Sequence, residues 1–307
     1  MLSSVPFEFP SYLSDLCRGI PPVSTAIVSA DSAIVLESAR AATEAGFIKP
    51  FLIGDSKKIQ TSADTINWDI REIPIVHAPG ELKAPKTAVA MARGDEVKAL
   101  MKGQIHTDSL MLPVIDKQRG LLLERRLSHV FHMTIPKSKK VLMITDGAVN
   151  VMPNIKTKID IIKNAIDLAH ALNIFMPKVA LLSGTETPIP SMPSSQEAKQ
   201  LVTLMAQGLK EEALIDGPFA LDNAISSEAA YLKGISGPVA GNADILVVPN
   251  IETGNSLFKM MVYFMSAVAA GIVLGGKVPI MLTSRGDPPE ARVASAALAN
   301  LIAHKTL

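Results

Sequence analysis

The sequence predicts an α/β protein, a two-domain α/β/α sandwich with mostly parallel sheets. Three observations lead to this prediction. Short runs of β-branched and aliphatic residues alternate with segments of helical spacing, which is the pattern of βαβ units. The chain has 307 residues, enough for one large or two ordinary domains. Its hydrophobic fraction is 48% but its aromatic fraction only 4%, as expected for buried parallel strands filled by aliphatic side chains.

The first half of the chain repeats the strand and helix patterns in order. A helix over 34–45 ends at Gly46, and the last helix of this half is capped by Thr107 or Asp108. The residues before 24 carry no clear pattern. The expected strands are 24–29, 51–53, 73–76 and the run from 99, and the other expected helices start at 54–56 or cover 84–93 and 109–117.

The second half begins with two adjacent strand-like runs, 127–135 and 141–144, separated by turn formers at 136–140. Such a pair predicts a hairpin or an antiparallel addition to the sheet. Further on, Ser194 or Ser195 is expected to cap a helix, and Ser226 to open a short one. The remaining expected elements are helices over 156–172 and 194–207 and strands over 179–182 and 213–215. Two successive strand-loop-helix units are expected between Ala243 and Leu307.

One domain boundary is predicted where charged residues at 124–126 interrupt the apolar pattern. Domain I then covers 1–126 and 285–307, because the last helix returns to it, and domain II covers 127–284.

Composition excludes several classes of protein. A net charge of +1 argues against a broad nucleic-acid surface. The single cysteine, Cys17, excludes an intramolecular disulfide and a cysteine-cluster metal site, and indicates a reducing, cytoplasmic compartment. The first ten residues lack a signal pattern, so no export is expected. The longest uncharged run, 260–276, is shorter than the roughly 20 residues that span hydrocarbon, so no membrane segment is predicted.

The segment Ser284-Arg285-Gly286-Asp287 combines a hydroxyl, a fixed positive charge and a carboxylate where a strand ends and a helix begins. A guanidinium is a planar fork suited to phosphate oxygens, and a helix start adds backbone donors. Helix capping alone explains Ser284 and Asp287. It does not explain Arg285, because a cation at a helix N-terminus opposes the dipole unless an anion is also present.

A second candidate turn contains Asn250, Thr253, Gly254 and Asn255 and also follows a buried strand. On spacing alone, a capped strand-to-helix connection and a ligand loop are equally consistent with it.

A third strand end carries His106 and Thr107, with Lys102 just before it. The usual glycine-rich motifs of dinucleotide and nucleoside triphosphate binding are absent from the sequence, as are the zinc hydrolase and serine hydrolase motifs. His129 and His132 share one expected strand at odd separation, so they face opposite sides and are poor joint metal ligands.

With these segments assembled, the chain from Cys17 onward resembles the phosphate acetyltransferase and phosphate butyryltransferase family. It looks closest to the phosphate acetyltransferase domain of a bifunctional enoyl-CoA hydratase/phosphate acetyltransferase, although the hydratase domain is absent. The segments that carry the resemblance are MKGQIHTDSLM at 101–111, RRLSHVF at 125–131, DNAIS at 222–226, PVAGNAD at 238–244 and LTSR at 282–285.

The resemblance implies the isocitrate and isopropylmalate dehydrogenase fold with an active-site cleft between two domains. It also implies a homodimer, no tightly bound cofactor and no metal. The implied reaction is reversible transfer of a short-chain acyl group between coenzyme A and inorganic phosphate, by thiolate attack in a ternary complex. The family pattern maps onto Ser284 and Arg285 as catalytic residues, and the substrate-binding positions onto His106, Thr107, Thr253, Gly254 and Asn255; Lys102 and Asn250 join the substrate-binding set from their strand ends.

Two departures from the family pattern matter for the chemistry. Acetyl-specific members carry an arginine shortly after the His-Thr pair, where this chain has Pro113. They also place the catalytic aspartate where this chain has Ala291, with Glu290 next to it and Asp287 nearer the Ser-Arg pair. The identity of the base stays open between these carboxylates, and Asp287 is our hypothesis for it. A second phosphate-binding arginine stays open, with Arg125 and Arg126 as candidates. The alternatives are an NAD(P)- and metal-dependent decarboxylating dehydrogenase on the same fold, or a non-catalytic coenzyme A-binding protein.

Overall fold

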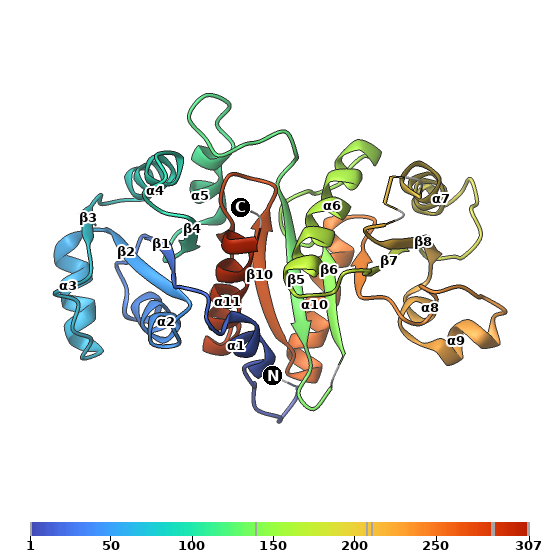
Figure 1. Ribbon diagram of the computed structural model, residues 1–307, viewed down its shortest axis with the longest axis horizontal. Coiled ribbons are helices and arrows are strands. Elements are labelled where there is room, and N and C mark those ends of the chain that lie inside the picture. The colour runs from blue at the N-terminus through green and yellow to red at the C-terminus, as the bar shows by residue number, and fades with distance from the viewer. Residues whose placement is uncertain (1, 139, 207, 210, 284–285, 306–307) are drawn as a thin grey trace. The chain divides into compact units, whose positions relative to one another are not determined.

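The computed structural model describes residues 2–138, 140–206, 208, 209, 211–283 and 286–305. The chain divides into two compact units (Figure 1). We name the two units by their place in the sequence. Glu8–Arg126 with Ala270–Leu307 is the outer unit, and Met1–Phe7 with Leu127–Ala269 is the middle unit. The predicted domains and these units share the division after Arg126. They differ at the N-terminus, because Met1–Phe7 belongs to the middle unit and not to the unit that holds Glu8–Arg126. They also differ at the return, which the sequence placed at 285 and the compact units place at 270, because β11 pairs with β4 of the outer unit.

The outer unit holds a sheet with strand order β3-β2-β1-β4-β11-β10, parallel except for the β10–β11 pair. Its strands are β1 (Val23–Val28), β2 (Ile48–Gly54), β3 (Ile75–His77), β4 (Ala99–Lys102), β10 (Val268–Leu274) and β11 (Ile280–Met281). Its helices are α1 (Ser11–Cys17), α2 (Ala33–Glu44), α3 (Ser56–Thr65), α4 (Lys83–Arg93), α5 (Thr107–Val114) and α11 (Pro289–Lys305).

Helices cover both faces of the outer sheet. Figure 1 shows α4 and α2 on opposite sides of β1 and β2. Helix α11 packs against α1, α2 and the strands β1, β4 and β11. Its alanines, from Ala291 to Ala303, are buried, because a helix of small residues can approach neighbouring elements closely.

The strands of the middle unit lie in the order β5-β6-β9-β7-β8, and neighbouring strands are parallel except for the β5–β6 pair. The hairpin predicted around 136–140 is therefore confirmed. The strands are β5 (Ser128–Thr134), β6 (Val141–Thr145), β7 (Lys178–Leu182), β8 (Leu214–Phe219) and β9 (Ile245–Val247). The helices are α6 (Ile155–Ala171), α7 (Pro193–Met205), α8 (Leu221–Ile225), α9 (Ser227–Leu232) and α10 (Ile251–Met265).

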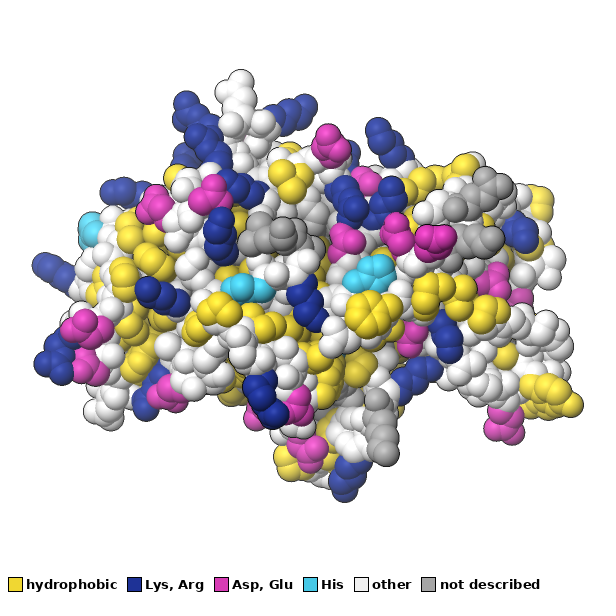
Figure 2. All heavy atoms as spheres, viewed as in Figure 1, with side chains coloured by type: hydrophobic (Ala, Val, Ile, Leu, Met, Phe, Trp, Pro, Cys, Tyr) yellow, Lys and Arg dark blue, Asp and Glu magenta, His cyan; other side chains and the backbone are white. Residues whose placement is uncertain are grey.

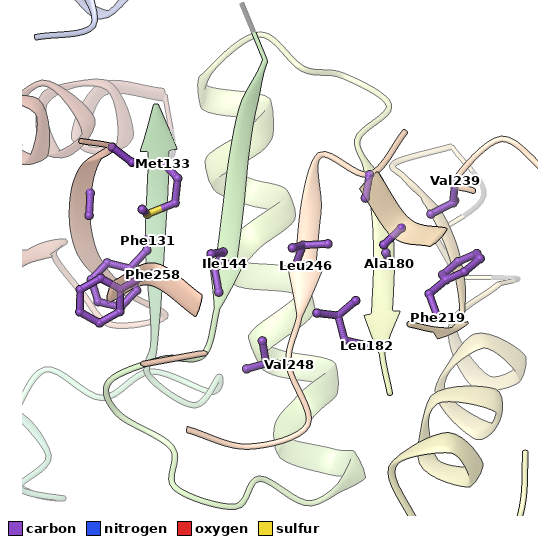
Figure 3. Packing of buried hydrophobic residues seen from close by; sticks show 14 of the residues in the cluster. Phe131, Met133, Ile144, Ala180, Leu182, Phe219, Val239, Leu246, Val248 and Phe258 are labelled. Atoms are coloured by element: carbon purple, nitrogen blue, oxygen red, sulfur yellow. The ribbon is translucent and has the colours of Figure 1, made fainter. Parts of the chain in front are cut away.

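The core of the middle unit lies between its sheet and helices α8, α9 and α10. Figure 3 shows Phe131 of β5 and Phe258 of α10 with their rings face to face, and their centroids are 3.9 Å apart. Ile144, Leu246 and Leu182 continue the same apolar layer across the neighbouring strands. Burial of such side chains is the main force that holds α10 on the sheet.

Several sequence predictions of elements were wrong in detail. Helix α1 was not expected. It packs against α11, and the Cys17 thiol donates to the Ala297 carbonyl of that helix. Helix α5 begins at Thr107, two residues early, with His106 as the N-cap. Helix α7 begins at Pro193 with Met192 as its N-cap instead of a serine, because proline is well suited to the first helical position.

The expected single strand near 271–283 is a pair. Strand β10 runs to Leu274, and β11 returns antiparallel to it before pairing in parallel with β4. Two other helices begin where the sequence placed them: at α3 the Asp55 carboxylate accepts from Lys57 N, and at α9 the Ser226 hydroxyl accepts from Ala229 N.

Candidate functional site

A cavity of about 300 Å³ opens at the carboxyl ends of β4 and β11 in the outer unit. Because these two strands are parallel neighbours, their ends meet at the same edge of the sheet, where ligands collect in α/β proteins. Helices α2 and α11 supply the other walls. The described residues that line the cavity are Ile34, Val35, Ser38, Met101, Lys102, Gly103, Gln104, Thr283 and Arg292.

The charged residues among these described lining residues are both cations. Lys102 is half-buried at the last position of β4, and Arg292 is 8% exposed on α11. Gln104 and Thr283 add an amide and a hydroxyl. A concave site with two cations and neutral donors is suited to an anion with several oxygens.

Arg292 is fixed in place by α2. Its Nη1 donates to the Ser38 hydroxyl at 3.0 Å and to the Ile34 carbonyl at 3.3 Å. The Ser38 hydroxyl in turn donates to the same Ile34 carbonyl at 2.8 Å, so its oxygen is turned toward the guanidinium as an acceptor. This arrangement orients Arg292 at the cavity wall.

Gly103 allows the chain to turn tightly at the end of β4. A Cβ at this position would lie 2.3 Å from the Val28 carbonyl oxygen and 2.4 Å from that of Ser29. The backbone N–H groups of Gly103 and Gln104 donate to these same two carbonyls. Only glycine permits this approach, and it places Lys102 and Gln104 on the cavity.

His106 and Thr107 lie at the start of α5, close to Lys102 in sequence but not on the described cavity lining. The His106 side chain is 67% exposed, and its Nε2 lies 3.9 Å from Glu81 Oε1. Thr107 is half-buried. The structure therefore places the predicted pair beside the cavity-bearing loop, with His106 facing solvent.

Ser284 and Arg285, the two predicted catalytic residues, lie outside the described residues. Thr283 precedes them directly and lines the cavity. Asp287 is half-buried and lies two residues before α11 begins at Pro289.

The Asn250–Asn255 turn belongs to the middle unit, where it begins α10. Asn250 is the N-cap, and its side-chain oxygen accepts from Thr253 N at 3.0 Å and from the Thr253 hydroxyl at 2.7 Å. Ile251 N donates to the Val151 carbonyl, and Gly254 N to the Asn250 carbonyl. The capping explanation thus accounts for Asn250, and these N–H groups already have acceptors.

The same turn packs against the loop after β6. Gly254 approaches Gly147 so closely that a Cβ on Gly254 would lie 2.8 Å from the Gly147 Cα. Asn255 Nδ2 donates to the Gly147 carbonyl at 3.4 Å. Two parallel neighbours, β6 and β9, therefore end in loops that support one another.

Asp146, a buried carboxylate that sequence reasoning did not single out, organises the loop after β6. It accepts from the backbone N–H groups of residues 129 and 148–150 and from the Asn150 side chain, over 2.7–3.2 Å. These five contacts fix the loop against which Gly254 packs.

Two other titratable groups are buried away from these loops. Burial raises the pKa of the Cys17 thiol to about 11, so that this cysteine is a packing residue with little thiolate at neutral pH. Burial lowers the pKa of His132 to about 4, which keeps the imidazole neutral at pH 7. His129 contacts Phe131 on one face of β5, and alternation places His132 on the other, as predicted.

The surface and the helices add two findings. On the face shown in Figure 2, basic and acidic side chains are interspersed, in keeping with the net charge of +1. Across the described ranges, no helix is long and apolar enough to cross a membrane, and no group of three or more His, Cys, Asp or Glu side chains is arranged to hold a metal ion.

Arg292 is the cavity residue that the sequence did not reveal as functional. One signal was available: it is a lone guanidinium within the alanine-rich segment that begins at Pro289. The structure brings Arg292 together with Lys102, one of the predicted binding residues. The other predicted group, at Asn250–Asn255, belongs to the separate middle unit.

Known proteins resemble this chain over most of its length. Residues 81–300 match the family model described as phosphate acetyl/butaryl transferase. A phosphate acetyltransferase of Rickettsia prowazekii is 45% identical over 94% of this chain and 82% of its own. A phosphate butyryltransferase of Clostridium acetobutylicum is 38% identical over 91% and 92%.

Solved structures agree with these relatives. The crystal structure of a branched-chain phosphotransacylase from Enterococcus faecalis has a TM-score of 0.79 and 32% identity, covering 92% of this chain and 99% of its own. A putative 4-hydroxythreonine-4-phosphate dehydrogenase from Salmonella typhimurium covers 92% and 99%, with a TM-score of 0.58 and 12% identity. This second likeness shows the fold alone, and it agrees with the predicted dehydrogenase-like architecture. The chain belongs to the phosphate acetyltransferase and phosphate butyryltransferase family of acyltransferases.

Proposed function

We propose that this protein transfers a short-chain acyl group reversibly between coenzyme A and inorganic phosphate, with the phosphate bound at the outer-unit cavity. The observation that carries this placement is the pair of cations, Lys102 and Arg292, on a cavity that Thr283 also lines. Ser284 and Arg285 follow Thr283 directly in the sequence. The phosphate site and the proposed catalytic pair therefore belong to one stretch of chain.

The proposed reaction toward acyl-CoA begins with the coenzyme A thiol, which gives its proton to Asp287. The thiolate sulfur then forms a bond to the carbonyl carbon of the acyl phosphate. The bond from that carbon to the phosphate oxygen breaks, and phosphate leaves with the electron pair. Arg285 and the Ser284 hydroxyl donate to the phosphate oxygens and stabilise the charge that develops there. No covalent intermediate with the protein is required, because holding both substrates together removes much of the entropic barrier.

Asn250, Thr253, Gly254 and Asn255 remain our proposal for binding part of the acyl-CoA. The Thr253 proton is donated to Asn250, so the Thr253 oxygen can act toward a ligand only as an acceptor. The N–H groups of Ile251 and Gly254 are also in use. The turn is thus better suited to the amide N–H and hydroxyl donors of the pantetheine arm than to a phosphate, which mainly accepts.

His106 and Thr107 are proposed to bind substrate at the start of α5. The exposed His106 imidazole can donate to an anionic substrate that approaches from solvent, and the half-buried Thr107 hydroxyl can add a hydrogen bond. Lys102 would attract the phosphate as a compact positive charge.

Release of thiol from a panel of acyl-CoAs in the presence of phosphate, together with detection of the acyl phosphate, tests the proposed function. Acetyl-CoA and butyryl-CoA are the first substrates to compare, because the named relatives include both activities. Asp287→Asn should lower kcat by about 10²- to 10⁴-fold, the usual contribution of general base catalysis. Arg285→Ala should also lose most turnover, whereas Arg71→Ala, an exposed arginine paired with Asp69, should not.

Near-normal turnover in Arg285→Ala would contradict the role given to that residue. The same assay separates the alternatives left open by the sequence. A change at 340 nm with NAD(P) and a hydroxy acid, without thiol release, would indicate a dehydrogenase; binding of coenzyme A without any turnover would indicate a non-catalytic protein. The named relatives do not favour either alternative.

Three further parts of this proposal concern the protein as a whole. We infer that it needs no tightly bound cofactor, since coenzyme A and phosphate are the reactants. We infer a homodimer, supported by apolar side chains on α10 that are about half exposed, namely Met260, Tyr263, Phe264 and Met265. The single buried cysteine supports a cytoplasmic location.

A further inference from the structure

We propose that Val151 and Met152 contact the acyl chain of the bound acyl-CoA and give this enzyme a preference for chains longer than acetyl. This inference rests on the proposed function, because it takes the Asn250–Asn255 turn as part of the acyl-CoA site. Both residues lie in the loop between β6 and α6 of the middle unit. They are 62% and 77% exposed, although both side chains are large and apolar.

The first argument is that this loop is fixed by hydrogen bonds although its tip is exposed. At the start of the loop, the Asp146 carboxylate accepts from the backbone N–H groups of residues 148–150, over 2.9–3.2 Å. At the end of the loop, Pro153 is buried, and the Asn154 side chain accepts from Thr157 N at 3.0 Å to cap α6. Because the backbone is already ordered, a ligand that covers the exposed tip pays little entropy for ordering it.

The second argument is the position of the loop beside the proposed acyl-CoA turn. The Val151 carbonyl accepts at 2.9 Å from the N–H of Ile251, the first residue of α10. Asn255 Nδ2 donates to the Gly147 carbonyl, at the start of the same loop. Val151 and Met152 therefore adjoin the turn that we propose for the pantetheine arm. The acyl group is bonded to the sulfur at the end of that arm, so an apolar surface at this place suits the acyl chain.

The third argument is the small extent of this apolar surface. A stable protein interface buries about 800 Å² and roughly 20–30 residues on each partner, which is far more than two side chains provide. Exposed polar residues, Asn154 and Glu252, follow Met152 and Ile251 in the sequence and limit the apolar surface. The apolar residues that we assign to the homodimer begin at Met260, about 14 Å farther along α10 at a rise of about 1.5 Å per residue. A short aliphatic chain therefore fits this surface better than a second protein.

The two side chains differ in a way that suits chains of several lengths. Val151 is β-branched and has a restricted side-chain rotamer, so it offers a fixed apolar surface. Met152 is unbranched and flexible, so it can pack against ligands of different shape. The named relatives include both phosphate acetyltransferases and phosphate butyryltransferases, so likeness to them does not set the chain length. A butyryl chain has two more methylene groups than acetyl, and partial burial of these groups favours butyryl-CoA by about 10-fold.

Substitutions at Met152 test the inference, because they change the polarity of an exposed side chain without disturbing the core. Met152→Gln keeps the length of the side chain but makes it polar, and Met152→Leu keeps it apolar. Val151→Thr keeps the branched shape and adds a hydroxyl. Met176→Gln is the matched control, because Met176 is also an exposed methionine of the middle unit and lies in the loop after α6, away from the turn that begins α10. All four variants should keep the wild-type Tm to within about 2 °C.

The experiment measures kcat/KM for acetyl-CoA and for butyryl-CoA at saturating phosphate, and the Kd of each acyl-CoA by calorimetry. The wild type should favour butyryl-CoA by about 10-fold in both measurements. Met152→Gln should weaken the use and binding of butyryl-CoA by about 3- to 10-fold and leave acetyl-CoA within about twofold, and Val151→Thr should act in the same direction. Met152→Leu and Met176→Gln should keep the wild-type preference.

Three results would overturn the inference. The first is a wild type that uses and binds acetyl-CoA as well as butyryl-CoA, and the second is an unchanged preference in Met152→Gln. The third is an equal loss for both acyl-CoAs in Met152→Gln, which would assign the loop to the pantetheine arm instead of the acyl chain. A wild type that transfers no acyl group from either acyl-CoA would refute the proposed function, and the difference in Kd between butyryl-CoA and acetyl-CoA would still decide this inference.

Discussion

Replacing Gly254 by alanine tests whether this glycine is needed for packing or for a ligand. The residue belongs to the turn that the sequence left open between a capped connection and a ligand loop. In the structure an added Cβ would lie 2.8 Å from the Gly147 Cα, 2.9 Å from the Asp146 carbonyl oxygen and 3.1 Å from a methyl group of Val248. The two nearest atoms are backbone atoms, which cannot move aside as a flexible side chain can.

The size of the effect follows from two opposing contributions. Overpacking a well-packed site costs about 1–3 kcal/mol, and contact with backbone on two sides places Gly254→Ala at the upper end of that range. The higher helix propensity of alanine within α10 stabilises the folded state by about 1 kcal/mol. The free energy of unfolding should therefore fall by about 2 kcal/mol, which lowers the Tm of a unit of this size by about 4–8 °C.

Thermal unfolding followed by circular dichroism measures this change. Gly208→Ala is the matched control in the same unit, because an added methyl group there meets nothing within 4 Å. It should keep the wild-type Tm to within about 2 °C, as for surface substitutions. A Gly254→Ala protein with wild-type Tm would refute the packing explanation, and if it also lost turnover, the result would favour the ligand-loop explanation.

Two buried groups of the middle unit give further predictions. Burial lowers the pKa of His132 from its ordinary 6.5 to about 4, so as pH falls the histidine takes up its proton in the unfolded chain before it does so in the folded protein. The free energy of unfolding should therefore be highest above pH 6.5 and fall by up to about 3 kcal/mol toward pH 4. Urea unfolding at several pH values measures this change. The free energy of unfolding should depend less on pH in His132→Gln than in the wild type, and as much as in the wild type in Met133→Leu. Asp146→Asn should lower the free energy of unfolding by about 2–4 kcal/mol, since an amide cannot accept from all five donors. Asp222→Asn, at a half-exposed ion pair with Lys233, should change it little in the same urea titration.

The alternation of elements could be predicted from sequence because it depends on local patterns. Buried parallel strands give short aliphatic runs, and the segment at 136–140 carries turn chemistry that fixes the β5–β6 hairpin. Capping was predicted correctly at Ser226, whose hydroxyl accepts from Ala229 N. It failed at α7, where Pro193 decided the helix start ahead of the nearby serines.

Features that depend on contacts between distant parts of the chain could not be predicted. Helix α1 is too short to be stable alone and is held by α11, as the contact between Cys17 and Ala297 shows. The parallel pairing of β11 with β4 joins segments about 180 residues apart. The place of Arg292 on the cavity wall depends on α2, whose Ser38 accepts from it across 254 residues of sequence.

The energies available at the two predicted binding regions favour the outer-unit cavity for phosphate. A helix N-terminus stabilises a bound anion by about 0.3–1 kcal/mol. At α10 less than this is available to a ligand, because the N–H groups of Ile251 and Gly254 already donate to protein acceptors. A unit positive charge about 4 Å from a unit negative charge contributes about 4 kcal/mol at the effective dielectric constant of a protein surface, before the cost of desolvation. Lys102 and Arg292 each bring such a charge to the cavity. The difference is several-fold, which supports our proposal that phosphate binds beside the two cations and that the turn at Asn250 binds the part of coenzyme A that carries hydrogen-bond donors.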